Sequence, residues 1–395
     1  MDKIDELLTR RVDTVYPNKK SLEKVLRSGK KLRLYQGFDP TGGRLHLGHT
    51  VGIRKLMEFA ALGHDVIFLF GDGTVLVGDP SEREKGRKLL SEKEVSENAK
   101  GWINQVKALV DFSKVRTLHN KDWLTKLTLK DIINIGSKIS AVQLFKRDNF
   151  SKRIKRGDTV WYHETMYPLL QGYDSVVMDV DMEIGGTDQM FNMLVGRELL
   201  HKFKNKEKFV MTTKMILGTD GKTMSKTSNN CIWLNDAPKD MYTKLMAVKD
   251  ELIPDYFEFF TNIPMEEVKK IVKGLLNNTL DPLATKKQLA FTITADIHGN
   301  VKAEQAQTEF AKVVQKGQTP ANIPVFPLNK LSQNPIGPID LLNETGLVSS
   351  RSEAKRLIKQ GSIELNRKKI LLFKSLKISS EDLVRSGKKK WIRLK

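Results

Sequence analysis

The sequence predicts an α/β fold in which a parallel-sheet domain is followed by an α-helical domain and a small α+β unit. Three observations support this. Over the first half of the chain, short apolar segments alternate with amphipathic segments of helical length, a pattern typical of β-α-β units. The pattern between 236 and 315 is helical throughout. A proline-rich segment then precedes a basic C-terminal region.

The first β-α-β unit begins with an expected strand at 32–38. An amphipathic helix is expected at 46–62, ended by Gly63, because glycine suits the residue after a helix C-terminus. The run at 65–70 is apolar throughout, as expected for a buried parallel strand. Glycine-rich breaks follow this strand, and open parallel sheets bind ligands at the carboxyl ends of their strands.

The remaining elements are assigned by similar signals. The first residues are expected to form one or two short helices that end at Gly29. Ser91 and Glu94 have the spacing of a capping box for a helix to about 111. The other expected elements are a helix after Thr128, a helix at 162–171, a strand at 175–180 and a helix after Gly185 and Gly186.

Composition limits the class of protein. The chain has 395 residues, 39% of them hydrophobic, which suggests two or three domains. No apolar stretch reaches the roughly 18 residues of a membrane span. The charged N-terminus lacks the apolar centre of a signal peptide, so the expected location is cytoplasmic. The single cysteine, Cys231, excludes an internal disulfide and a multi-cysteine zinc site.

The charge balance favours a polyanionic partner. The net charge is +20 and the pI about 9.7. Residues 331–395 hold 15 Lys and Arg against 6 Asp and Glu, a net charge of +9, so about half of the excess lies in the last sixth of the chain. Nucleic acid is the simplest such partner. A generally basic proteome or a solubility effect is the alternative.

The most informative segment is 35–49, YQGFDPTGGRLHLGH. His46 and His49 lie three residues apart at the start of the expected helix, so their rings share one face. Free N–H groups and the helix dipole favour an anion at that end. The segment therefore predicts a phosphate site. Two histidines at a helix start can also be ordinary surface or capping residues.

Three further constellations carry chemistry. Tyr167, Gln171 and Asp174 share one helical face, which makes a poor core stripe but a suitable wall for a polar pocket. Paired glycines in the run 185–189, GGTDQ, permit close backbone approach, here to a ribose. The run 220–227, DGKTMSKT, offers cations and hydroxyls for a developing phosphate charge. An exposed helix face or a surface turn would have the same composition.

Two basic segments stand out. The stretch 146–156 holds six basic side chains and fits either a nucleic-acid contact or a solvated loop. Within 346–366, a basic helix surface precedes a turn at Gly361 and can contact phosphates without reading sequence. A solvated helix is the alternative there. Its basic residues are Arg351, Lys355, Arg356 and Lys359.

The order of these motifs resembles that of bacterial-type tyrosyl-tRNA synthetases, class I aminoacyl-tRNA synthetases with a C-terminal S4-like RNA-binding domain. The run 46–49 has the form of their HIGH signature, and 220–227 resembles their KMSKS loop. Thr223 replaces the first lysine of that loop, and Lys222 is the candidate substitute. The resemblance implies a Rossmann-like catalytic domain that activates L-tyrosine with ATP. Tyrosine is then transferred from tyrosyl-adenylate to the 3′ end of tRNA(Tyr).

The resemblance also implies residue roles. The implied catalytic residues are His46, His49, Ser225, Lys226 and Thr227. The implied tyrosine-binding residues are Tyr35, Asp79, Tyr167, Gln171, Asp174 and Gln189, with Asp174 and Tyr35 on the phenol. The implied ATP-binding residues are Gly37, Asp39, Thr41, His46, His49, Gly186, Asp188, Arg83, Arg87 and Lys226. RNA contacts are expected from Arg351, Lys355, Arg356 and Lys359.

The expected domains are a catalytic domain at 1–218 with an insertion near 112–155, a mobile loop and α-helical anticodon-binding domain at 219–318, a linker at 319–336 and the RNA-binding domain at 337–395. The resemblance implies a homodimer through the insertion. Mg²⁺ is expected with the substrate ATP; no protein-bound metal and no membrane contact are expected.

Two rivals remain. A tryptophanyl-type synthetase would share the fold, but Asp174 with Tyr35 argues against it because an indole has no hydroxyl. The other rival is a non-catalytic RNA-binding protein derived from a synthetase. The presence of His46, His49 and Lys226 argues against it, whereas Thr223 in place of a motif lysine is compatible with it.

Overall fold

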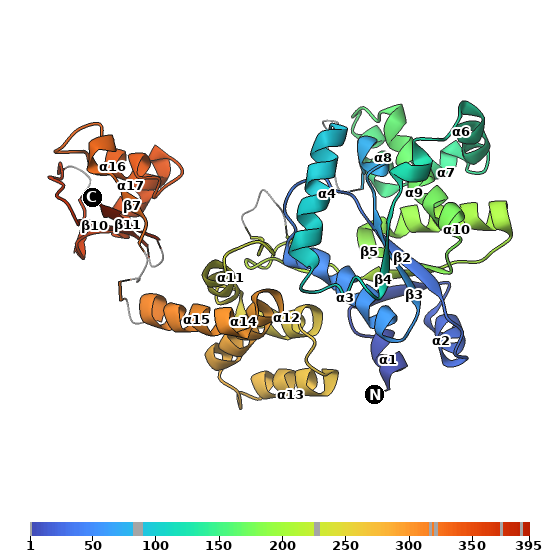
Figure 1. The fold of residues 1–395 in the computed structure, drawn as a ribbon, viewed down its shortest axis with the longest axis horizontal. Coiled ribbons are helices and arrows are strands. Elements are labelled where there is room, and N and C mark those ends of the chain that lie inside the picture. The colour runs from blue at the N-terminus through green and yellow to red at the C-terminus, as the bar shows by residue number, and fades with distance from the viewer. Residues whose placement is uncertain are drawn as a thin grey trace. The chain divides into compact units, whose positions relative to one another are not determined.

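The computed structural model confirms the predicted α/β fold class (Figure 1). Its contacts divide the chain into two compact units, Met1–Asn300 and Val301–Lys395, which are described separately below. The domain boundaries expected from the sequence remain a prediction. The residues that the structure describes are 2–81, 90–224, 230–315, 318–319, 323–371, 374–387 and 390–395.

A six-stranded sheet forms the centre of the first unit. The strand order is β1-β6-β5-β2-β3-β4, and all neighbours are parallel except β1, which runs antiparallel to β6. Parallel strands need helical crossovers, which explains the alternation read from the sequence. The strands are β1 (Val12–Tyr16), β2 (Arg33–Phe38), β3 (Asp65–Phe70), β4 (Val115–His119), β5 (Met182–Gly186) and β6 (Phe209–Thr213).

Helices cover both sides of this sheet. In Figure 1, α3 and α4 lie on one side of the strands, and α9 and α10 lie on the other. The helices along the sheet are α1 (Lys3–Leu7), α2 (Lys19–Arg27), α3 (Leu47–Ala61), α4 (Glu92–Val106), α5 (Lys121–Leu124), α6 (Leu129–Gly136), α7 (Ala141–Phe145), α8 (Asp148–Lys155), α9 (Tyr162–Met178) and α10 (Met190–Lys204).

A helical layer follows the sheet in the sequence, as the pattern from residue 236 predicts. It contains α11 (Pro238–Leu245), α12 (Ile253–Phe260), α13 (Met265–Leu276) and α14 (Pro282–His298). α11 and α12 both pack on α14. Among the described residues, no helix is both long enough and apolar enough to cross a membrane.

The sheet has a topological switch point between β2 and β5, at the carboxyl ends of its strands. β2 pairs with β3 on one side and with β5 on the other, and the chain leaves these strands toward opposite ends of the sheet. Phe38 at the end of β2 pairs with Phe70 at the end of β3, and Gly186 pairs with Thr213 across β5 and β6. In folds of this kind ligands bind in the crevice at such a point.

One predicted element of the main sheet is wrong, and the strands β1, β4 and β6 were not predicted. The strand expected at 175–180 is the last turn of α9, and the strand itself is β5. Val176 suggested a strand because it is β-branched, but it packs against Val195 and Leu199 of α10, so tertiary packing overrides its propensity. Among the missed strands, β1 is short and half exposed, and its burial alternates too weakly to stand out in the sequence.

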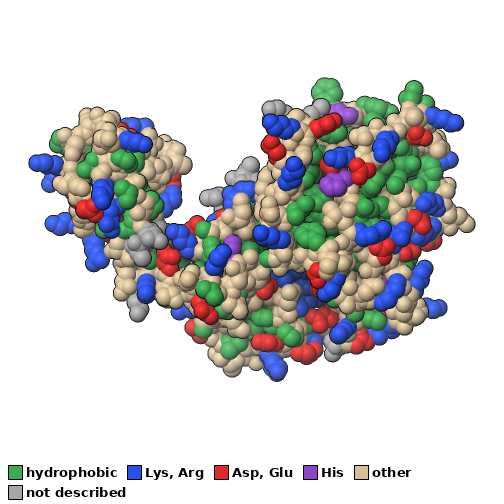
Figure 2. All heavy atoms as spheres, in the orientation of Figure 1, with side chains coloured by type: hydrophobic (Ala, Val, Ile, Leu, Met, Phe, Trp, Pro, Cys, Tyr) green, Lys and Arg blue, Asp and Glu red, His purple; other side chains and the backbone are tan. Residues whose placement is uncertain are grey.

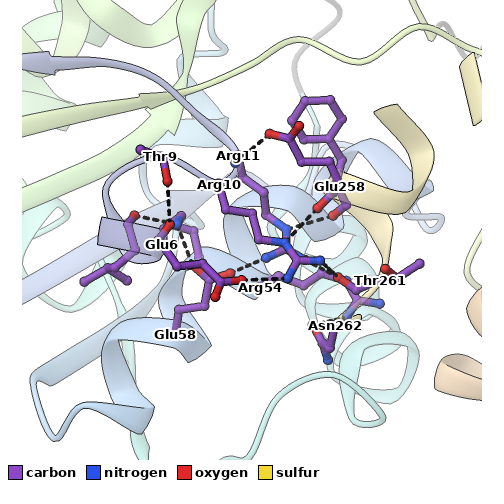
Figure 3. A network of polar contacts seen from close by, with 12 residues as sticks. Glu6, Thr9, Arg10, Arg11, Arg54, Glu58, Glu258, Thr261 and Asn262 are labelled. Atoms are coloured by element: carbon purple, nitrogen blue, oxygen red, sulfur yellow. Dashed lines mark hydrogen bonds and ion pairs between the residues drawn. The ribbon is translucent and has the colours of Figure 1, made fainter. Parts of the chain in front are cut away.

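A buried group of cations fixes α3 to the chain's N-terminus and to α12. We call Arg10, Arg11, Arg54 and Lys55 the arginine cluster (Figure 3). Figure 3 shows Arg10 and Arg11 reaching Thr261, whose carbonyl oxygen accepts from both guanidinium groups.

The cluster is neutralised by specific acidic partners. Glu58 forms ion pairs with both Arg11 and Lys55. Arg54 donates to Asp296 Oδ2 at 2.9 Å, which links α3 to α14. Such partners are required, because a buried unpaired cation is strongly destabilising.

The second unit begins at Val301, the second residue of α15 (Asn300–Phe310), and contains a five-stranded sheet of order β7-β11-β10-β8-β9. Its remaining elements are β7 (Val325–Phe326), α16 (Pro338–Glu344), α17 (Arg351–Lys359), β8 (Ile363–Leu365), β9 (Lys368–Lys369), β10 (Leu383–Ser386) and β11 (Lys390–Leu394). Although β7 lies in the range 319–336 assigned to a linker, it pairs with β11, and Phe326 packs on the unit's core.

Lys55→Met tests whether the arginine cluster is as dry as its geometry indicates. Burial lowers the pKa of Lys55 from 10.5 to about 8, and Glu58 offsets this only in part. The folded chain therefore binds fewer protons than the unfolded chain between these values, so the lysine's contribution to stability rises with pH. Urea unfolding should show the wild-type-minus-variant free energy increasing by about 2 kcal/mol between pH 7 and 9.5.

Lys202→Met is the matched control, because Lys202 pairs with Glu198 on an exposed helix face. Its difference from the wild type should stay flat over the same pH range. A flat difference for Lys55→Met as well would mean that the Lys55 ammonium is solvated in the folded chain.

Candidate active site

A cavity of about 870 Å³ opens at the carboxyl ends of β2, β3, β5 and β6. It collects every described residue to which the resemblance gives a tyrosine-binding, ATP-binding or catalytic role. These lining residues are Tyr35, Gly37, Asp39, Thr41, His46, His49, Asp79, Tyr167, Gln171, Asp174, Gly186, Asp188 and Gln189. Segments up to 154 residues apart in the chain therefore meet in one site.

The two histidines lie at the N-terminus of α3, as predicted. His46 is the N-cap residue, and its backbone N–H donates to His49 Nδ1 at 3.1 Å. The ring centroids are 3.9 Å apart, so both imidazoles face the same part of the cavity. In the first turn, the Leu47 N–H donates to the Ile232 carbonyl oxygen and the His49 N–H to the His46 carbonyl oxygen, so the expected free N–H groups are not found at these two residues. The two imidazoles and the helix dipole remain as the features that suit a phosphate.

Asp174 is held at one end of the cavity by two donors that the sequence did not reveal. Asn120 Nδ2 donates to Asp174 Oδ2 at 3.0 Å, and Trp123 Nε1 donates to Oδ1 at 2.8 Å. Burial raises the pKa of Asp174 well above its ordinary value, and these two bonds act in the opposite direction. Since both oxygens accept an N–H, the contacts suit a carboxylate.

Asn120 and Trp123 follow β4, at the strand end where ligand-binding residues gather. No sequence signal identified them, because neither residue belongs to a motif and β4 itself was not predicted. Asn120 also accepts the Gly73 N–H at 2.7 Å, so it holds the loop after β3 beside Asp174.

Tyr35 is fully buried on β2, and its hydroxyl lies 2.9 Å from Ser175 Oγ. Burial raises the pKa of Tyr35 well above 10, and the nearby Glu183 and Asp174 carboxylates add to this. The hydroxyl therefore stays protonated at neutral pH and can donate a hydrogen bond.

A second polar group lies around the glycine-rich breaks. Tyr167 donates its hydroxyl proton to Asp39 Oδ2 at 2.9 Å. Gln189 Nε2 donates to Asp79 Oδ2 and to Asp188 Oδ2, both at 2.7 Å. Three carboxylates thus lie near one another, an arrangement that attracts an ammonium group or a metal-bound nucleotide.

The turn after β5 has no room for a side chain at Gly186. A Cβ there would lie 2.3 Å from Asp188 Oδ1. Burial raises the pKa of Asp188, although Gln189 donates to it. The glycine therefore lets the backbone and the Asp188 carboxyl approach a ligand together.

The basic stretch 146–156 divides into two kinds of side chain. Arg147 is buried and lies 3.6 Å from Asp79 Oδ1, and Arg153 is buried against Glu164. Neither fits the predicted alternatives of a nucleic-acid contact or a solvated residue. The exposed members are Lys146, Lys152, Lys155 and Arg156.

Several predicted residues lie outside the described part of the chain. They are Arg83, Arg87, Ser225, Lys226 and Thr227. The start of the 220–227 run is described, and there Thr223 lines the cavity while Lys222 is exposed and does not line it. Within the described ranges, no group of three His, Cys, Asp or Glu side chains is placed to hold a metal ion.

The predicted RNA-binding residues lie together in the second unit. Arg351, Lys355, Arg356 and Lys359 all belong to α17 and are exposed, while Ala354 and Ile358 of the same helix are buried. The helix thus presents one basic face, and Arg351 also pairs with Asp340.

The chain belongs to the class I tRNA synthetases. The family model "tRNA synthetases class I (W and Y)" matches residues 27–315, more than half of the chain, and the "S4 domain" model matches 340–372. The predicted resemblance to bacterial-type tyrosyl-tRNA synthetases is confirmed by relatives that match over nearly full length.

Two of these relatives are named tyrosine–tRNA ligase. The protein of Thermotoga maritima is 40% identical over 98% of this chain and 96% of its own length. The protein of Oleidesulfovibrio alaskensis is 40% identical over 95% of each chain. A C-terminally truncated mitochondrial tyrosyl-tRNA synthetase of Aspergillus nidulans shares the fold, with a TM-score of 0.66, 21% identity and coverage of 78% of this chain and 92% of that one.

Trp123→Phe should change the ionisation of Asp174 while keeping an aromatic ring in place. The substitution removes one donor to the carboxylate, so we expect the pKa of Asp174 to rise further. Isotope-edited infrared titration measures this, with Asp174→Asn to assign the carboxyl band.

Trp102→Phe is the matched control. Trp102 also lines the cavity, but its N–H donates to the Gly42 carbonyl oxygen at 2.6 Å. We expect no change in the Asp174 titration for this variant. Equal shifts in both variants would mean that general packing, and not the Trp123 N–H, governs the carboxyl.

Proposed function

We propose that the chain is a tyrosine–tRNA ligase that activates L-tyrosine with ATP and then esterifies tRNA(Tyr). The observation that carries this proposal is the end of the cavity formed by Asp174 and Tyr35. A phenol hydroxyl both donates and accepts, and a carboxylate beside a protonated tyrosine hydroxyl satisfies both needs. Phenylalanine offers no hydroxyl, so it could neither donate to Asp174 nor accept from Tyr35.

The amine end of the proposed substrate would lie among Asp79, Tyr167 and Gln171, with Gln189 beside them. Asp79 supplies negative charge, and Gln189 holds it by a 2.7 Å hydrogen bond. An ammonium group needs acceptors only, which these side chains provide. The distance between the two ends of the cavity is then spanned by one amino acid.

In the proposed first step, a carboxylate oxygen of tyrosine attacks the α-phosphorus of ATP, and the bond to pyrophosphate breaks. His46 and His49 would donate to phosphate oxygens as negative charge moves onto the leaving group, helped by Ser225, Lys226, Thr227, Arg83 and Arg87. Catalysis is then positioning and charge stabilisation, without a covalent enzyme intermediate.

ATP would bind along the β2–α3 turn and the turn after β5. Gly37, Asp39 and Thr41 are proposed for the phosphate side, and Gly186 with Asp188 for the ribose hydroxyls. Mg²⁺ would arrive with ATP as part of the substrate. In the second step, the 3′-terminal ribose hydroxyl of tRNA attacks the tyrosyl carbonyl and releases AMP; since the substrate is tRNA, we propose that the enzyme acts in the cytoplasm.

ATP–pyrophosphate exchange, measured with each amino acid separately, tests this function. We expect exchange with tyrosine. Exchange with tryptophan alone would assign the cavity to the sister synthetase. The absence of exchange with any amino acid, with tRNA binding retained, would favour a non-catalytic RNA-binding protein.

His46→Ala is the matched variant for the exchange assay. We expect about a hundredfold lower exchange, because one donor to the developing phosphate charge is lost. Tyrosine affinity, measured by equilibrium dialysis, should be retained. An unchanged exchange rate would exclude a catalytic role for this histidine.

The basic face of α17 is proposed to contact the tRNA backbone. Lys355→Glu/Lys359→Glu should lower tRNA aminoacylation about tenfold, more at low salt than at high salt, because phosphate contacts release counterions. Tyrosine-dependent exchange should not change. Lys20→Glu/Lys24→Glu on α2 has the same spacing and exposure and is the control. Equal losses in both variants would exclude a specific role for α17.

We further propose that the enzyme is a homodimer through the region around α6 to α9. Large apolar side chains are exposed there, with Leu129 76%, Val142 64% and Tyr162 82% exposed. Figure 2 shows hydrophobic side chains gathered over this part of the first unit. A contiguous apolar surface of this kind is typical of an interface. The other exposed members are Ile133, Phe145, Ile154 and Trp161.

Leu129→Glu/Val142→Glu should convert the dimer to a monomer, because it places charges in an apolar interface. Light scattering after size-exclusion chromatography measures the mass. Leu276→Glu, at an equally exposed position on α13, should leave the mass unchanged. A wild-type chain that is already monomeric would exclude the proposed interface.

A further inference from the structure

A buried ion pair lies next to the cavity. Lys208 is completely buried and Glu183 is 2% exposed, and the lysine ammonium donates to the glutamate carboxylate. Glu183 belongs to β5 and Lys208 directly precedes β6, so two parallel neighbours bring the charges together. Desolvating such a pair costs free energy that apolar side chains would not, so stability alone does not account for it.

The packing of α9 on α10 leaves room for this lysine. A Cβ at Gly172 of α9 would lie 3.1 Å from Gly196 Cα of α10. A Cβ at Gly196 would lie 2.7 Å from Lys208 Nζ and 3.1 Å from Ser175 Oγ. The helices therefore approach closely at two glycines, and any side chain at 196 would displace the ammonium.

On one side, the ion pair orients the amide of Gln171. Gln171 Nε2 donates to Glu183 Oε1 at 3.0 Å. Since a carboxylate only accepts, the amide must turn its NH₂ toward Glu183 and leave its carbonyl oxygen for another donor. This carbonyl oxygen, Gln171 Oε1, is buried and has no hydrogen-bond partner in the described structure. Gln171 lines the cavity. An ammonium group is the donor that fits its Oε1 atom.

On the other side, the ion pair orients two hydroxyls. Lys208 Nζ donates to Ser175 Oγ at 2.8 Å, and Ser175 Oγ lies 2.9 Å from the Tyr35 hydroxyl. Because an ammonium only donates, Ser175 accepts from Lys208. Although burial raises the pKa of Tyr35, the Ser175 hydrogen bond acts to lower it, which is the effect of a donor to the Tyr35 oxygen. The Glu183 carboxylate is also a hydrogen-bond acceptor for the Tyr35 hydroxyl and raises its pKa, so a phenol oxygen in the cavity would replace Glu183 as the acceptor of this proton.

We propose that the Glu183–Lys208 pair sets the direction of the hydrogen bonds at both ends of the amino-acid pocket. It presents a carbonyl oxygen of Gln171 to the substrate ammonium and a proton of Tyr35 to the phenol oxygen. The inference rests on the proposed function and assigns positioning roles to residues outside the motifs. Ser175 and Lys208 act through Tyr35, and Glu183 acts through Gln171.

At the phenol end of the pocket, each hydrogen bond then has a fixed direction. Asp174 accepts the substrate's hydroxyl proton, and the substrate's oxygen accepts from Tyr35. An aromatic amine donates well but accepts poorly, so 4-aminophenylalanine should be rejected by the wild-type pocket. Removing Ser175 frees the Tyr35 hydroxyl to turn and accept, which should relax this rejection.

The first test compares Ser175→Ala with the wild type in ATP–pyrophosphate exchange on tyrosine, phenylalanine and 4-aminophenylalanine. We expect kcat/KM for tyrosine to fall about five- to tenfold, as for one lost hydrogen bond. The value for phenylalanine should not change, and 4-aminophenylalanine should gain relative to tyrosine. Unchanged tyrosine/phenylalanine and tyrosine/4-aminophenylalanine ratios would overturn the phenol-end assignment.

The second test neutralises the pair with Glu183→Gln/Lys208→Gln, which leaves no unpaired buried charge. Amides can face either way, so Gln171 is no longer held in one orientation. We expect KM to rise about fivefold for tyrosine and phenylalanine alike, in addition to the lost phenol selectivity. Wild-type KM values and ratios in a folded double variant would overturn the proposal. If the double variant does not fold, Ser175→Ala decides.

Lys286→Met is the matched control, because it removes a largely buried lysine from its ion pair with Asp250, and neither residue lines the cavity. Its melting temperature should change, but its tyrosine/phenylalanine ratio should not. A similar loss of selectivity in this control would mean that general destabilisation explains the loss in the pocket variants, and it would overturn the proposal. A wild-type chain that exchanges no amino acid would instead overturn the proposed function.

Discussion

The position of α3 is the constraint on which the catalytic end of the molecule depends. Its N-terminus carries His46 and His49, while its body carries Arg54 and Lys55 of the arginine cluster. Each guanidinium N–H in such a cluster needs an oxygen in a fixed direction, so the contacts set rotation and axial position together. Apolar contacts of equal area would fix the rotation and the axial position of α3 less precisely, because they have no directional requirement. Anchoring α3 on α12 and α14 in this way holds the histidines over the cavity.

Hydrogen-bond direction is the second constraint, and it follows from which groups can only donate or only accept. Asp174 and Glu183 accept only, whereas Lys208, Trp123 and Asn120 Nδ2 donate. Groups that could serve either way, the hydroxyls and the Gln171 amide, lie between these fixed ends. Their orientation is therefore determined by buried charge before any substrate arrives, which reduces the reorganisation needed on binding.

The sequence predicted those parts of the site that depend on local spacing. A helix start fixes two histidines three residues apart, and a helical face fixes Tyr167, Gln171 and Asp174, so both groups were readable from the chain. The sequence could not predict which distant residues would hold them. Asn120 reaches Asp174 because the end of β4 lies beside α9, and Ser175 reaches Tyr35 because α9 also lies on β2. The prediction of a strand at 175–180 was wrong for a similar reason, because packing of this segment on α10 stabilises a helix there.

The ionisation of Asp174 shows why buried polar networks are needed to recognise a small hydroxyl. Burial alone favours the protonated carboxyl, which would offer a proton where the substrate phenol also offers one. The N–H groups of Asn120 and Trp123 favour the carboxylate, and the nearby Lys208 ammonium adds positive charge. In the proposed pocket, selectivity for a phenol over a bare ring therefore depends on keeping the Asp174 charge where water is excluded. That requirement explains why the surroundings of Asp174 are rich in donors and not simply apolar.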